Sequence, residues 1–134
     1  MITEHAAPVL AALRGIANPA LTVSDGPADP QNPPDLPYVV PYISIDVPDA
    51  VSFEEAYDKV TCTIAVHSVA GNSDAVRRVA DRVLAALLGL RPVIPGRDCS
   101  RIRRVDGQPP DWDRSTGRLL VWQVDVFEYE TLPG

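Results

Sequence analysis

The sequence predicts an α+β domain, in which a mixed, mostly antiparallel sheet of about four strands carries two helices packed on one face. Residues 59–67 alternate between polar and apolar side chains, a period of two that is typical of a half-buried strand. Residues 73–88 place apolar side chains at steps of three and four, which is typical of an amphipathic helix. The expected order is helix, strand, strand, helix, strand, strand. This order favours antiparallel strands with helices on one face, and it allows one right-handed crossover around the second helix.

A first helix is expected from Thr3 to Arg14. Its apolar stripe consists of Ala6, Val9, Leu10 and Leu13. Gly15 can terminate this helix. Pro8 has no backbone N–H, so it must lie within the first turn or bend the helix. A short strand around Leu21 to Val23 is expected to follow.

The segment from Ser24 to Pro37 is predicted to be a loop or an extended arm. Its five prolines, three aspartates and one glycine are incompatible with a helix or a central strand. Loops of this length within a compact domain are usually functional or disordered. Two interpretations remain open, namely a solvated loop and an arm that lies on a neighbouring subunit.

A second strand is expected from Tyr38 to Val47. Pro41 within it cannot donate a hydrogen bond to a neighbouring strand, so the strand lies at a sheet edge or is interrupted there. Residues 48–57 contain either a turn or a short helical turn, and the sequence does not decide between the two.

The stretch from Asp58 to Leu90 supplies most of the expected core. The apolar face of its strand consists of Val60, Cys62, Ile64 and Val66. The apolar stripe of its helix consists of Val76, Val79, Ala80, Val83, Leu84, Leu87 and Leu88. Asn72 or Ser73 can accept hydrogen bonds from the free N–H groups at the helix start. Gly89 can end the helix in a left-handed conformation.

Two further strands, joined by a long hairpin loop, close the predicted domain. The first runs from Cys99 to Val105, the loop from Asp106 to Gly117, and the second strand from Arg118 to Glu130. The second is the longest strand and is expected to be central or second from an edge, with residues 131–134 as a tail. Trp112 in the loop either folds back on its own domain or anchors a partner, because exposed aromatic side chains concentrate binding energy.

Size and composition indicate one domain, residues 1–134, that is large enough to fold without a disulfide or a metal. The net charge of −6 argues against a nucleic-acid-binding surface as the main activity. No apolar run approaches the ~20 residues that cross a bilayer, so no membrane association is expected. The N-terminus is acidic and polar, and it is interpreted as part of the fold rather than as a secretion signal. Two cysteines are too few for a disulfide framework, which makes a reducing compartment the default.

The sequence carries no strong signal for catalysis, metal binding or cofactor binding. His67 ends a strand beside Ser68, but no nucleophile motif such as G-x-S-x-G accompanies it. The two histidines and two cysteines lack the paired spacing of a zinc site. Neither G-x-G-x-x-G nor G-x-x-x-x-G-K-[ST] occurs. The expectation is therefore a protein that is not an enzyme, with no catalytic residue, metal or cofactor.

The stretch from Thr63 to Gly89 resembles the tail terminator proteins of tailed phages (siphophages). The resemblance is carried by a strand ending VHSVAG, a polar cap and the helix AVRRVADRVLAALLG. The surrounding layout is also similar, with an N-terminal helix, a proline-rich insertion and a closing strand LLVWQVDVFEY. The resemblance implies a structural virion protein that forms a ring, commonly a hexamer, on the end of the tail tube. Such a ring stops tube growth and offers a surface to the neck of the capsid.

The implied partners are further copies of the chain, the tail tube protein and a neck or head-completion protein, assembled in the host cytoplasm. A ring requires two different patches of one subunit to meet. The expected contact residues are Asp29, Pro30, Asn32, Pro33, Pro41, Asp111, Trp112 and Arg114. An acidic chain also suits a lumen through which DNA passes without specific binding, because like charges repel.

Three alternatives remain beside the tail terminator. The first is a neck, head–tail connector or tail-completion protein of the same particle. The second is a small ligand-binding or enzymatic α+β domain with a pocket near His67 and Trp122. The third is a small dimeric adaptor.

Overall fold

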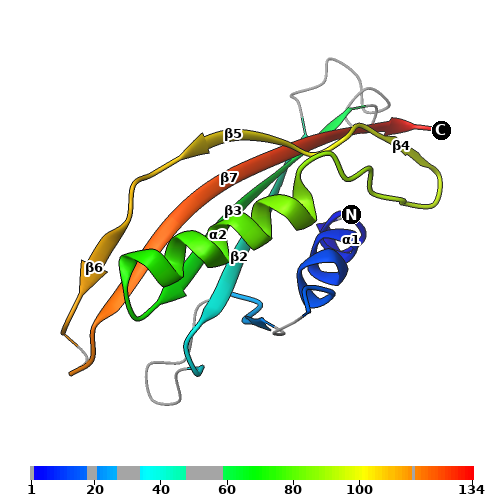
Figure 1. Ribbon diagram of the computed structural model, residues 1–134. Coiled ribbons are helices and arrows are strands. Elements are labelled where there is room, and N and C mark those ends of the chain that lie inside the picture. Colours follow the sequence, from blue (N-terminus) through cyan, green and yellow to red (C-terminus); the bar gives the residue numbers. More distant parts are fainter. Residues whose placement is uncertain (1, 18–20, 27–33, 48–58, 116) are drawn as a thin grey trace.

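The computed structural model describes residues 2–17, 21–26, 34–47, 59–115 and 117–134 (Figure 1). Its elements are α1 (Ile2–Arg14), β1 (Thr22–Val23), β2 (Tyr38–Asp46), β3 (Val60–Ala70), α2 (Ser73–Leu87), β4 (Arg97–Cys99), β5 (Arg103–Gly107), β6 (Asp111–Asp113) and β7 (Leu120–Pro133). Residues 27–33, half of the expected arm, and the expected turn at 48–57 lie outside the described residues.

The seven strands form one sheet in the order β1-β2-β3-β7-β4, with β5 and β6 also paired to β7. β1 runs parallel to β2, and the other pairs are antiparallel. The predicted α+β class with a mixed sheet is therefore confirmed, whereas the expected number of about four strands is too low. The short strand expected around Leu21 to Val23 is confirmed as β1. β4 and β6 have three residues each, and such segments are too short to show a period of two in the sequence.

Both helices and one face of the sheet enclose the main core. Its buried side chains include Val9 and Leu13 of α1, Val79, Val83 and Leu87 of α2, Cys62, Ile64 and Val66 of β3, and Phe127 and Tyr129 of β7. Figure 1 shows α2 lying along β3 and β7, with α1 beside it. The alternation that predicted the apolar face of β3 is thus confirmed.

The predicted boundaries of α2 agree with the structure to within one residue at its C-terminal end. Oδ1 of Asn72 accepts a hydrogen bond from the backbone N–H of Ala75 at 2.8 Å, which satisfies one of the free donors at the helix start. Gly89 has φ +79°, the left-handed conformation expected for it. Leu88 does not belong to the buried stripe, because it already has extended backbone angles and its side chain is 51% exposed.

α1 differs from its prediction in its buried face. The buried side chains are His5, Val9 and Leu13, whereas Ala6 and Leu10 of the expected stripe are only partly buried. Pro8 lies inside the helix beyond its first turn. A buried histidine was not part of the predicted stripe, because histidine is polar and its burial depends on partners elsewhere in the chain.

The boundaries at the C-terminal end require three corrections. The expected strand Cys99 to Val105 divides into the end of β4 and the start of β5. The expected hairpin loop Asp106 to Gly117 contains the end of β5 and all of β6. The expected tail 131–134 is mostly strand, because β7 continues to Pro133 and pairs there with β4. β7 lies between β3 and β4, second from an edge as predicted.

Candidate functional site

One edge of the sheet is open along the second half of β2. β1 pairs only with Tyr38 and Val39, so within the described residues Pro41–Asp46 pairs with β3 alone. The carbonyl oxygen of Val39 accepts a hydrogen bond from the N–H of Ser24 at 2.9 Å, so the odd-numbered residues of β2 direct their backbone groups away from β3. The backbone nitrogen of Pro41, which carries no hydrogen, therefore faces this open edge, so its lack of a donor costs no hydrogen bond to β3. The sequence predicted either a sheet edge or an interruption of the strand at Pro41, and the edge is confirmed, because β2 continues through Pro41.

A groove of about 860 Å³ lies between α1 and this open edge. Its apolar lining includes Ile2, Ala6 and Leu10 of α1 and Tyr42 and Ile43 of β2. Asp25 and Arg14 are the charged residues of the lining. Ala6 and Leu10, expected to be buried in the core, are thus available for contact with another molecule. The sequence contained one signal for this groove. The apolar stripe of α1 is wider than the helix face that packs on the core, so part of the stripe remains uncovered.

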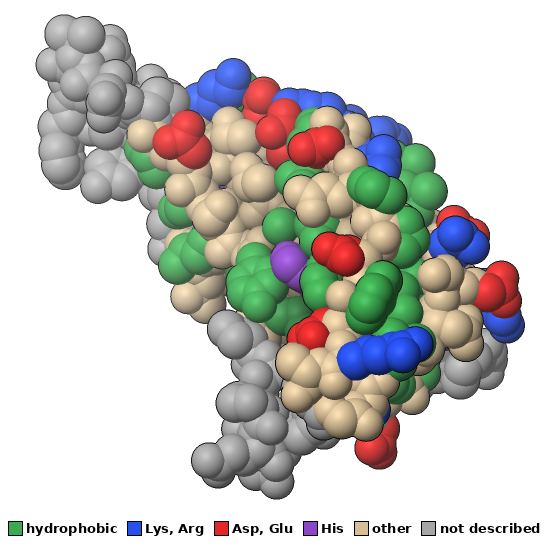
Figure 2. Space-filling view, turned by 90° about the vertical axis from the view of Figure 1, so that its left-hand side faces the viewer, with side chains coloured by type: hydrophobic (Ala, Val, Ile, Leu, Met, Phe, Trp, Pro, Cys, Tyr) green, Lys and Arg blue, Asp and Glu red, His purple; other side chains and the backbone are tan. Residues whose placement is uncertain are grey.

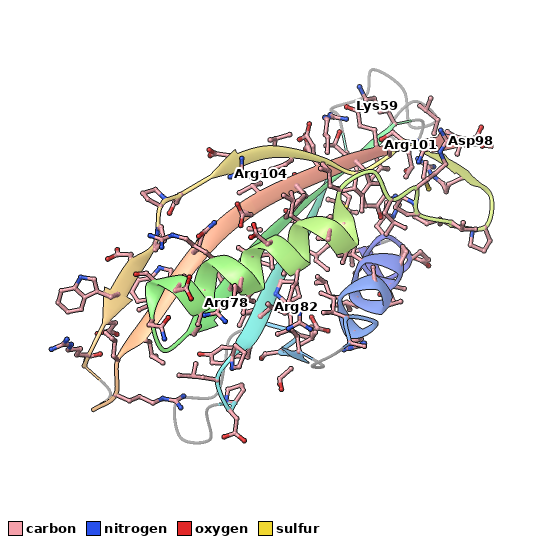
Figure 3. All side chains as sticks on the ribbon, in the orientation of Figure 1. Lys59, Arg78, Arg82, Asp98, Arg101 and Arg104 are labelled. Atoms are coloured by element: carbon pink, nitrogen blue, oxygen red, sulfur yellow. The ribbon has the colours of Figure 1, made fainter. Side chains whose placement is uncertain are left out.

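The opposite edge of the sheet is formed by β4, β5 and β6, which pair with successive parts of β7. Arginine side chains of β5 hold this edge to carboxylates of β7. Nη2 of Arg104 lies 2.9 Å from Oδ1 of Asp125, and Arg103 forms ion pairs with Glu128 and Glu130. Figure 3 shows Arg104 on β5, beside β7. The hydrogen bond from Arg103 lowers the pKa of the Glu130 carboxyl, with a further contribution from Lys59.

Trp112 of β6 is the most prominent aromatic side chain at this second edge. It is 63% exposed, so it does not fold back on its own domain. It pairs with Val121, whose side chain packs with Val76 of α2, so Trp112 lies on the helix side of the sheet. The guanidinium carbon of Arg114 lies 5.6 Å from the centroid of the indole, a cation–π contact. This edge therefore presents an indole and a guanidinium to solvent, flanked by the carboxylates of Asp111 and Asp113.

The predicted contact residues divide between these two edges. Pro41 lies at the β2 edge. Asp111, Trp112 and Arg114 lie at the β6 edge, on the other side of the sheet order. Within one chain the structure does not bring the two groups together. The remaining predicted contacts, Asp29, Pro30, Asn32 and Pro33, lie outside the described residues.

The face of the sheet away from the helices carries His67 in contact with Tyr42. Their ring centroids are 4.9 Å apart in an edge-to-face arrangement, and burial lowers the pKa of the His67 imidazole. Figure 2 shows a histidine surrounded by hydrophobic side chains, with acidic groups nearby. Ser68, the next residue, is buried among residues of the opposite face, so its hydroxyl is not directed toward the imidazole. These two residues are therefore not arranged as a nucleophile and its base.

The described part of the chain contains no group of three or more His, Cys, Asp or Glu side chains arranged to hold a metal ion. None of its helices has the length and apolar character required to span a membrane.

No protein-family model matches the chain, and no curated protein matches it. Among solved structures, the chain is similar to a chain in a structure described as the virion of a native gene transfer agent particle, with a TM-score of 0.66. The two sequences are 17% identical, and the similar region covers 96% of this chain and 93% of the other. At this level of identity the similarity shows a shared fold over almost the whole of both chains.

Proposed function

We propose that the protein is a structural component of a virion, and specifically a tail terminator that forms a ring on the end of the tail tube. The observation that carries the proposal is the shared fold with a chain of a gene transfer agent virion over nearly the full length of both chains. The sequence resemblance to tail terminators of tailed phages supports the same class of protein. Neither observation depends on a catalytic residue, because the proposed role is assembly rather than chemistry.

The positions of the two open edges support a ring of identical copies. β2 runs parallel to β7, and β5 and β6 run antiparallel to β7, so β2 is antiparallel to β5 and β6. A rotation about an axis inclined to the strands, by about 35–45° as in barrels, brings the β5–β6 edge of one copy antiparallel to the β2 edge of the next and displaces it along the strands. The same rotation keeps the helices of every copy on the same side. Such a contact joins two different patches, and repeated contacts of this kind form a ring when the rotation between copies closes.

The proposed partners are further copies of the chain, the tail tube protein and a neck or head-completion protein. The proposed location is the tail or neck of the virion, after assembly in the host cytoplasm. With a net charge of −6, the chain favours a lumen that repels phosphates, so that DNA passes without specific binding. A neck or tail-completion protein of the same particle would form the same kind of ring at a different place in the virion.

Native mass spectrometry of the full chain, alone and with the tail tube protein of the same particle, tests the ring. We expect a closed multiple of the subunit mass, a hexamer for the expected ring, in at least one of the two conditions. Tube protein from an unrelated phage is the matched control and should give no complex. A monomer or a dimer in both conditions would contradict the proposed function.

Tube length, measured by electron microscopy, separates the terminator role from the neck role. A terminator added during polymerisation of the tube protein should shorten the tubes and leave a ring at one end. Unchanged tube length, together with binding to preformed tubes, would instead indicate the neck role.

A further inference from the structure

We propose that the groove between α1 and β2 receives the indole of Trp112 from a second copy of the chain, with Arg114 of that copy beside Asp25 at the groove. The inference rests on the proposed ring and identifies the contact that joins neighbouring subunits. Both halves of the contact are present in every chain, at opposite edges of one sheet. Each copy can therefore donate an indole to one neighbour and accept one from the other.

The groove has the size and the chemistry that an indole requires. Its volume of about 860 Å³ exceeds that of a tryptophan side chain, and most of its lining is apolar. Two large hydrophobic residues of the lining, Ile2 of α1 and Tyr42 at the β2 edge, are each 41% exposed, and Tyr42 also contacts His67 on the far face of the sheet. An aromatic side chain buries about 150–250 Å² when it is enclosed, and clusters of this kind dominate interface energies. Occupation by Trp112 would remove apolar surface from water on both copies.

The orientation of the indole agrees with the position of the groove. Trp112 lies on the helix side of the sheet, because it pairs with Val121 beneath α2. The groove is bounded by α1, which packs on the same side through Val9 and Leu13.

Through β7 and β3, Trp112 is level with Ala70, one residue beyond the Val69–Tyr38 pair, whereas the groove lies beside Pro41 and Ile43. The neighbouring copy must therefore also be displaced along the strands by several residues, as it is in a barrel with tilted strands. With that displacement, a β6 strand that runs antiparallel along the β2 edge points its indole toward α1.

The charges at the two ends of the contact are complementary. Arg114 stacks on Trp112, and the groove is lined by Asp25 and by Arg14, so the position beside the Asp25 carboxylate, and not the groove as a whole, is complementary to the guanidinium. The side chains of Arg114 and Asp25 are exposed, and within the described ranges neither forms an ion pair in the isolated chain. Insertion of the indole would bring the guanidinium that accompanies it toward the carboxylate. Complementary charges of this kind fix the register of an interface more than they raise its affinity.

Cysteine cross-linking between whole chains tests the contact directly. In a Cys99→Ser background, one protein carries Asp25→Cys and a second carries Arg114→Cys, so that Trp112 is retained in both. After mixing and mild oxidation, with and without tail tube protein, we expect a disulfide-linked dimer that contains one chain of each kind. The matched control replaces Arg114→Cys by Val93→Cys, since Val93 is 87% exposed but belongs to neither edge. This pair should give at least tenfold less product.

A second measurement uses tryptophan fluorescence and the strength of association. Trp122→Phe leaves Trp112 as the single tryptophan, and its emission should shift to shorter wavelength on assembly because the indole leaves water. Trp112→Ala should weaken association by about tenfold or more. Asp25→Arg should also weaken it, and combining Asp25→Arg with Arg114→Asp should restore part of the loss.

The outcomes distinguish this inference from the proposed function. Rings that form without the Asp25–Arg114 cross-link, and that tolerate Trp112→Ala, would overturn the inference and leave the ring in place. Absence of any assembly or cross-link, with and without tail tube protein, would overturn both.

Discussion

Nε2 of His5 in α1 lies 2.9 Å from Oγ1 of Thr131 in β7, a contact that joins two residues 126 positions apart in the sequence. Oγ1 of Thr131 also accepts a hydrogen bond from Nε of Arg97 at 3.1 Å, so the hydroxyl hydrogen of Thr131 is available to the imidazole. The hydroxyl of Tyr129 donates to the backbone carbonyl of His5 at 2.5 Å. α1 is therefore held to the C-terminal strand by polar contacts as well as by the core, and these contacts position one wall of the groove.

Tyr129→Phe should lower the free energy of unfolding by about 1–3 kcal/mol. The substitution removes the hydroxyl and leaves the carbonyl of His5 without that donor, in a buried environment. Urea denaturation followed by circular dichroism measures the change. Tyr42→Phe is the matched control, because Tyr42 is 41% exposed, and it should change stability by less than about 0.5 kcal/mol. Equal effects of the two substitutions would contradict a role for the Tyr129 hydroxyl.

Asn72→Ala should lower the free energy of unfolding by about 1 kcal/mol. The side chain of Asn72 accepts from the N–H of Ala75, and alanine cannot replace this bond. Asn72→Asp retains an oxygen at the same place and adds a negative charge at the positive end of α2, so it should preserve stability. Thermal and urea denaturation of both variants measure the difference. If alanine and aspartate destabilise the protein equally, the cap does not contribute to stability.

The parts of the fold with strong local signals could be predicted from the sequence. The alternation in β3 and the stripe of α2 identify their buried faces. The sequence offered Asn72 or Ser73 as the cap of α2, and the structure has Asn72 there. Pro41 indicated an open edge because a proline cannot donate a hydrogen bond to a neighbouring strand, whatever the rest of the chain does. These features come from steric and hydrogen-bonding limits that act over a few residues.

The features that depend on distant residues could not be predicted. β4 and β6 have three residues each, and they form strands because they pair with the long strand β7. The burial of His5 depends on Thr131 and Tyr129, which no local pattern relates to it. The groove was missed for the same reason, since it exists only where α1 lies beside the open part of β2. The exposure of Trp112 rules out one of the two interpretations that the sequence left open, in which the indole folds back on its own domain, and its role as an anchor for a partner stays a prediction.

Cys62 should resist alkylation in the folded protein. Burial raises the pKa of its thiol to about 11, and the thiolate is the reactive form. At pH 8 roughly one thiol in a thousand is then ionised, and the side chain is enclosed in the core. In a Cys99→Ser variant, iodoacetamide labelling followed by mass spectrometry should be at least about tenfold slower than in urea, where the thiol is exposed with an ordinary pKa.

The matched control for this labelling is Cys62→Ser, which leaves Cys99 as the single cysteine. Cys99 is only partly buried, and burial also raises the pKa of its thiol. It should therefore react faster than Cys62 in the folded protein and at a similar rate in urea. Faster labelling of Cys62 than of Cys99 in the folded state would contradict the packing of β3 against the helices.

The stability of the protein should fall between pH 7.5 and pH 5.5, in part because of His67. Burial lowers the pKa of this imidazole in the folded state below its usual value of about 6.5, so the unfolded chain binds the proton first as the pH decreases. The loss begins near the unfolded pKa and is complete below the folded pKa. Carboxylates with lowered pKa values, such as Glu130, also lose their contribution on acidification, but they do so below about pH 4.5.

Urea denaturation at the two pH values, for the wild type and for His67→Gln, isolates the contribution of His67. The variant cannot be protonated, so the difference in stability between pH 7.5 and pH 5.5 should be smaller than in the wild type. Glu130→Gln is the matched control and should alter the pH dependence only at lower pH. An NMR titration of the wild type provides an independent readout, because it follows the imidazole itself. A His67 pKa at or above its usual value, or an unchanged pH dependence in His67→Gln, would show that the sheet face beside Tyr42 does not disfavour the charged imidazole.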